Sequence, residues 1–151
     1  MTGTDDLPEQ LAQIVQDFAE VGRPERLQLL LDFSRELPAL PDRVRAEHDA
    51  MEPVAECQSP VFLLVEVEPA VPQGRVHLYF DAPAEAPTTR GFAGILHEGL
   101  DGLSAEEVLA VPDDVPDRLG LTAAVSPLRL AGMAGMLGRI KRQVREKSVA
   151  A

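Results

Sequence analysis

The chain has 151 residues, 45% of them hydrophobic and 26% charged, and a formal net charge of −11. This length and composition predict one folded domain over residues 1–151 with a flexible start at residues 1–6, and a single cysteine excludes an internal disulfide or a thiolate zinc site. The acidic balance disfavours nucleic acid as a partner, and the absence of a long apolar run or a secretory signal predicts a soluble, cytoplasmic protein that does not bind a membrane.

The first third of the chain is predicted to form two helices. Apolar residues recur at helical spacing over residues 8–21, and a glycine and a proline then separate this segment from a second apolar helix that ends at Leu37. Two prolines prevent that helix from continuing, so residues 38–53 are expected to form a polar connection with a helical turn over 43–51.

The spacing of the apolar residues changes in the middle of the chain. Residues 61–68 are rich in Val, Leu and Phe, and residues 75–81 alternate between apolar and polar, which is typical of β-strands. Turn-forming residues lie between them, so the two strands are expected to pair as an antiparallel hairpin, with or without a third strand.

Helices are predicted to follow the hairpin. The first has Thr88 or Thr89 as its cap and runs to Leu100, and the second begins with the capping box Ser104–Glu107. The two aspartates at 113–114 are flanked by prolines and are expected to form a turn. This order of elements predicts an α+β fold in which a small antiparallel sheet is covered by helices.

The last helix is expected to open at Ser126-Pro127 and to be basic towards its end. Six of the 14 basic residues and one of the 25 acidic residues follow position 128, so this end carries a charge of +5 and the rest carries −16. We expect these cations to form a solvated face that adds little to stability; docking on an acidic partner is the alternative. The apolar stripe that should pack on the sheet is Leu128, Met133, Met136, Leu137, Ile140 and Val144.

Common catalytic motifs are absent from the sequence. It contains neither of the usual glycine-rich phosphate loops and no nucleophile elbow. The three histidines lack metal-ligand spacing, and His77 is expected on the solvated face of the second strand. The carboxylates form no pair in a setting that would separate their pKa values. Cys57 is therefore the candidate for chemistry.

Cys57 lies on the polar loop Val54–Pro60, directly before the first strand. An inert, buried thiol is one interpretation, because free cysteine behaves as a small hydrophobic residue. Its position at a strand edge favours function, because reactive groups concentrate on loops that a rigid scaffold holds. Glu56 is expected to raise the pKa of the thiol by charge repulsion, unless the fold brings in a cation such as Arg129 that reverses the effect.

Five short motifs occur in order over roughly residues 10–147. They are Glu36–Pro41, Cys57-Gln58-Ser59 before an apolar strand, Arg90-Gly91-Phe92, Leu103–Val108 and Ser126-Pro127-Leu128-Arg129. Together they resemble the SufE family, the sulfur-acceptor partners of cysteine desulfurases in iron–sulfur cluster assembly. The chain departs from the family pattern at Glu56, where Gly is common, and at Pro60 and Phe62, where Gln and Trp are usual. The loss of that glycine changes the conformations open to the loop.

The resemblance implies a thiol relay rather than an enzyme. The desulfurase, which carries pyridoxal phosphate, forms a persulfide on its own cysteine, and the Cys57 thiolate attacks the terminal sulfur. Cys57 then passes the sulfur to an iron–sulfur scaffold or another acceptor, and this chain binds no cofactor. A loop that includes Glu56, Gln58 and Ser59 would tuck the thiol against an apolar pocket at rest and turn outward on docking.

The resemblance further implies that Arg129 orients the sulfur anion; an ordinary surface ion pair of Arg129 is the alternative. Two other classes of function stay open. One is a hydrolase or thiol peroxidase with Cys57 as its nucleophile, although no histidine stands in a recognisable relation to that residue. The other is a non-catalytic adaptor in which Cys57 plays no part.

Overall fold

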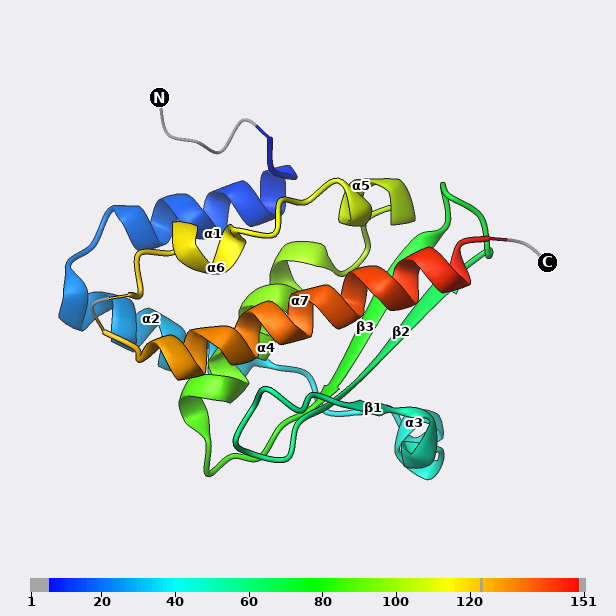
Figure 1. Ribbon diagram of the computed structural model, residues 1–151, viewed down its shortest axis with the longest axis horizontal. Helices are drawn as coiled ribbons and strands as arrows, with labels where there is room; N and C mark the ends of the chain where they lie inside the picture. Colours follow the sequence, from blue (N-terminus) through cyan, green and yellow to red (C-terminus); the bar gives the residue numbers. More distant parts are fainter. Residues whose placement is uncertain (1–5, 123, 150–151) are drawn as a thin grey trace.

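Two long helices pack against a small antiparallel sheet, and the first two helices of the chain pack on one of them (Figure 1). The computed structural model describes residues 6–122 and 124–149. Its elements in chain order are α1 Glu9–Ala19, α2 Arg23–Glu36, α3 Asp42–Ala46, the 3-10 turn η1 His48–Ala50, β1 Glu52–Pro53, β2 Phe62–Glu68, β3 Arg75–Asp81, α4 Pro87–Leu100, α5 Ala105–Leu109, α6 Val115–Arg118 and α7 Pro127–Lys147. The predicted α+β fold is confirmed.

The sheet has the order β1-β2-β3, with both pairs antiparallel, so the hairpin has a third strand. Leu63 lies opposite Phe80, and Val65 lies opposite Leu78. All four side chains are buried, and they form the face of the sheet that meets the helices. The alternation that predicted the strands therefore marks the core side of the sheet.

Helix α7 crosses the sheet over β2 and also packs on α4, α5 and α6 (Figure 1). The five predicted stripe residues from Met133 to Val144 are buried. Leu128 is not part of the stripe, because its side chain is 55% exposed. Five residues separate Leu128 from Met133, which places them about 140° apart around the helix. Leu130 takes the buried position in the first turn instead.

Helix starts follow the sequence signals with one exception. Helix α7 opens at Pro127, with the Ser126 hydroxyl as its cap, and α5 has the predicted capping box. Helix α4 begins at Pro87, so the expected cap at Thr88 or Thr89 is wrong. A proline in the first helical position is already set to the helical φ angle, so the helix starts before the threonines.

Residues 1–6 are expected to be flexible, and residues 1–5 lie outside the described residues. The Asp6 carboxylate accepts two hydrogen bonds from Arg118 of α6, at 2.8 and 2.9 Å. Arg118 also pairs with Asp114 at 2.9 Å. Residues 113–114 form the expected turn, and α6 follows directly after it. At four residues, α6 is too short to show helical periodicity in the sequence.

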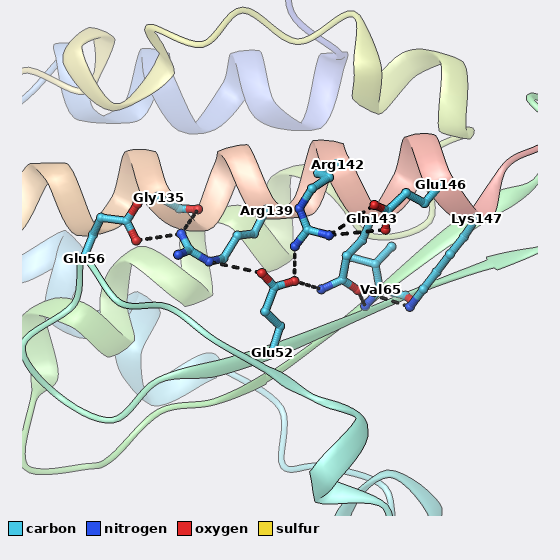
Figure 2. Close-up of polar contacts among 9 residues, drawn as sticks. All are labelled: Glu52, Glu56, Val65, Gly135, Arg139, Arg142, Gln143, Glu146 and Lys147. Atoms are coloured by element: carbon cyan, nitrogen blue, oxygen red, sulfur yellow. Dashed lines mark hydrogen bonds and ion pairs between the residues drawn. The ribbon is translucent and has the colours of Figure 1, made fainter.

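The basic end of α7 is bound to the sheet (Figure 2). Arg142 and Gln143 both donate to the Glu52 carboxylate of β1, Gln143 at 3.0 Å. The Lys147 ammonium donates to the backbone oxygen of Val65 at 2.5 Å. The expectation of a solvated basic face is therefore wrong here, because strands distant in sequence supply acceptors that the helix pattern alone does not reveal.

Candidate functional site

The Cys57 loop, residues 54–61, is closed at its base by the sheet. The Val54 N–H donates to the Val61 carbonyl oxygen at 2.9 Å, and both valines are buried. Within the loop, the Cys57 N–H donates to the Val54 carbonyl oxygen at 3.1 Å. Because β1 and β2 hold its two ends, the loop presents Cys57 at a defined place beside α7.

The thiol lies against the backbone of α7. Cys57 is partly buried at the edge of the hydrophobic core, and a Cβ built on Gly132 would lie 3.1 Å from its Sγ atom. Glycine at this position lets the helix and the loop approach closely. The thiol is tucked away as expected, but the cavity beside it has mainly polar side chains and is not the apolar pocket that was expected.

Burial, and after it the negative charge of the Glu56 carboxylate, raises the pKa of the Cys57 thiol to about 11. The Arg139 guanidinium opposes both effects without cancelling them. The predicted influence of Glu56 is confirmed. The cation that acts on the thiol is Arg139, which the sequence analysis did not single out, and not Arg129.

A cavity of about 270 Å³ opens beside the thiol. It is lined by residues 56–59 of the Cys57 loop, by residues 85–89, and by Leu128, Arg129 and Gly132 of α7. Arg129 thus lies at the same cavity as the thiol, and its exposed guanidinium forms no ion pair or hydrogen bond within residues 6–122 and 124–149. The ordinary ion pair considered for Arg129 is absent from that part of the chain, so its positive charge is free to face the cavity.

Comparison of the sequence with protein-family models identifies the family of this chain. A family model described as "SufE: Fe-S metabolism associated domain" matches residues 12–144. The chain belongs to the SufE family. The matched range includes the Cys57 loop, the start of α4 and all but the last three residues of α7, the segments that form the cavity.

Individual relatives agree with this assignment. A SufE-like protein of Mycobacterium tuberculosis is 57% identical over 146 residues, which are 97% of this chain and 99% of that protein. The sulfur acceptor protein CsdE of Escherichia coli is 30% identical over 110 residues, 72% of this chain and 69% of that protein. The solution structure of a hypothetical protein from Thermus thermophilus is 40% identical with a TM-score of 0.80, covering 93% of this chain and 97% of that chain.

One part of the cavity in this SufE-family chain was missed by the sequence analysis, namely the start of α4. Residues 86–89 line the cavity, and the first α4 turn closes with the Arg90 N–H on the Ala86 carbonyl oxygen at 2.9 Å. The positive end of this 14-residue helix therefore lies at the cavity. Pro87 in the first helical position was the signal that could have located it.

No histidine lines the cavity within the described ranges. His48 pairs with Asp81 at 2.7 Å, while His77 and His97 lie 3.7 and 3.8 Å from Asp101. A cysteine hydrolase needs a base beside its nucleophile, and this arrangement offers none from a histidine in that part of the chain. The described residues also contain no group of three His, Cys, Asp or Glu suited to a metal, and no helix long and apolar enough to cross a membrane.

Proposed function

We propose that this chain accepts sulfur on Cys57 from the persulfide of a cysteine desulfurase, stimulates that enzyme, and passes the sulfur on for iron–sulfur cluster assembly. The observation that carries the proposal is a lone thiol on an anchored loop beside a cavity with an unpaired arginine and no histidine among the described residues. The family's link to iron–sulfur metabolism and the name of the relative CsdE, a sulfur acceptor, support it.

The transfer is a thiol exchange without net oxidation. Cys57 loses its proton, and the thiolate attacks the terminal sulfur of the desulfurase persulfide. The new bond joins Sγ of Cys57 to that sulfur, the old sulfur–sulfur bond breaks, and the desulfurase cysteine leaves as a thiolate that takes up a proton. The pyridoxal phosphate stays on the desulfurase, and this chain needs no cofactor of its own.

The cavity suits the product of this exchange. A persulfide on Cys57 carries a terminal sulfur that is readily ionised, and the cavity beside the thiol has about 270 Å³ of space. We assign Arg129 to orient and neutralise that sulfur anion, with help from the positive end of α4. Gln58 and Ser59 line the same cavity and complete its wall on the loop side.

Having one cysteine is an advantage for a carrier. A second thiol nearby would attack the persulfide, form a disulfide and release sulfide. The sequence has no such thiol, so sulfur on Cys57 stays in place until an external acceptor, such as an iron–sulfur scaffold, removes it.

The test is mass spectrometry of the full chain after incubation with a cysteine desulfurase, pyridoxal phosphate and free cysteine. We expect an adduct of about 32 Da on Cys57 that a reductant removes, together with faster release of sulfur by the desulfurase. The matched control is Cys57→Ser, which should keep the fold and bind the desulfurase but take no sulfur. If the serine variant stimulates the desulfurase as well as the wild type does, the covalent relay is wrong and an adaptor role replaces it.

A further inference from the structure

An ion pair fastens the Cys57 loop to α7. The Glu56 carboxylate lies 2.6 Å from Nη1 of Arg139, and Nε of Arg139 lies 3.4 Å from the Glu52 carboxylate of β1 (Figure 2). The same Nη1 atom donates to the Gly135 carbonyl oxygen at 3.2 Å. The guanidinium is thus fixed on its own helix and lies between two carboxylates, one from the strand and one from the loop.

The surface of α7 is shaped to receive this part of the loop. A Cβ built on Gly135 would lie 2.8 Å from the Glu56 carboxylate carbon, and one on Gly132 would lie 3.1 Å from Sγ of Cys57. The two glycines are one turn apart and leave room for two neighbouring loop side chains. At Gly138, one turn further on, nothing lies within 4 Å of such a Cβ. The close contact between helix and loop is therefore confined to Gly132 and Gly135 among these three glycines.

We propose that Glu56 and Arg139 are positioning residues, which hold the Cys57 loop, and with it the partly buried thiol, on α7 until the pair separates. Glu56 acts in two ways: its own negative charge disfavours the thiolate, and it neutralises the cation that would favour the thiolate. Its role in sulfur transfer depends on the function proposed above. When the loop leaves α7, the thiol leaves the burial that contributes most to its raised pKa, while Glu56, its neighbour in the chain, moves with it.

Other charges near the thiol do not replace this pair. Across the cavity lie Arg129 and Glu85, one of each sign, and Glu52 faces Arg139 rather than the sulfur. Burial, Glu56 and Arg139 are the influences that set the pKa of Cys57 to about 11. A change at Glu56 should therefore show directly in the pH dependence of Cys57 reactivity.

The first experiment measures the rate at which iodoacetamide alkylates Cys57 in the free full-length chain from pH 7 to pH 10. Glu56→Gln keeps the size of the side chain, removes its negative charge and leaves Arg139 paired with Glu52, so the rate at pH 8 should rise several-fold. The matched control is Glu146→Gln, which removes a carboxylate from an ion pair with Arg142 on the same helix and should alkylate like wild type. A wild-type pH profile for Glu56→Gln would overturn the proposal.

A second pair of variants changes the room between α7 and the Cys57 loop without changing any charge. Gly135→Ala should displace the Glu56 carboxylate and raise the alkylation rate several-fold, whereas Gly138→Ala should leave it unchanged, although both add a helix-favouring residue to α7. Equal alkylation of these two variants would refute the fitted position of the loop. Neither experiment uses a desulfurase, so the expected changes in alkylation together with no sulfur transfer would refute only the proposed function.

Discussion

Replacing Leu137 by Ala tests whether α7 forms the centre of the core. The Leu137 side chain is 1% exposed on the helix face that crosses β2. The matched control is Leu128→Ala, which truncates the same side chain on the same helix where it is 55% exposed. The sequence pattern placed both leucines in one buried stripe, so the comparison separates the pattern from the observed packing.

The loss in the free energy of unfolding depends on how far the side chains around Leu137 can close the cavity that Leu137→Ala leaves. A buried Leu→Ala change costs about 2–5 kcal/mol, and the cost is higher where the surroundings cannot close the cavity. Arg139 in the middle of α7 and Lys147 at its end fix the helix to the Cys57 loop and the sheet, so we expect about 3–4 kcal/mol at Leu137. At about 2.1 cal/mol/K per residue, the 151 residues give an unfolding entropy near 0.3 kcal/mol/K and a loss of about 10 °C in Tm.

Urea denaturation followed by circular dichroism measures this difference, with thermal melts as a second readout. The midpoint should fall for Leu137→Ala with an unchanged slope, and Leu128→Ala should stay within about 0.5 kcal/mol of wild type. A loss below about 1 kcal/mol at Leu137, or equal losses at the two positions, would refute the packing argument.

Three further predictions concern charge and the thiol. Lys141→Glu should lower Tm more than Arg145→Glu in parallel melts, because Lys141 is 12% exposed and lies 2.7 Å from Asp113, whereas Arg145 is exposed. The rate of Cys57 alkylation in the wild type should rise about tenfold per pH unit from pH 7 to 10, because the thiol stays mostly protonated below its pKa of about 11. A plateau of this rate near pH 9 would contradict the prediction. Arg129→Gln should keep the wild-type Tm but slow sulfur transfer, and an unchanged transfer rate would remove Arg129 from the mechanism.

Local signals predicted most of the fold. The apolar spacing located the long helices and the hairpin, and Ser104 and Ser126 marked two helix starts correctly, because caps and periodicity depend on neighbours within a few residues. The role of the basic end of α7 could not be predicted in this way. Arg142 finds its partner Glu52 ninety positions away, and only the packing of α7 beside β1 brings them together.

The residues of the site also fall into two groups, those that the sequence revealed and those that only the packing revealed. Cys57 could be found because it is the one cysteine in the sequence, and the family motifs pointed to Arg129. Arg139 was grouped with other basic residues of a solvated face, although it is the cation that acts on the thiol. Its importance depends on Glu56 lying 2.6 Å away across the gap between loop and helix, and no spacing in the sequence encodes that distance.

The raised pKa of Cys57 discriminates between the functions considered at the start. At pH 7, a thiol with a pKa of about 11 is almost entirely protonated, whereas peroxidases and cysteine hydrolases depend on a thiolate that is already present at rest. A sulfur carrier has no such requirement, because it reacts only while its donor is bound. Keeping the thiol neutral between encounters then protects it from oxidants, which attack the thiolate. If docking separates Glu56 from Arg139 and lifts the loop off α7, Cys57 leaves the burial that contributes most to its raised pKa, so the thiol would become exposed and more easily ionised in the same event.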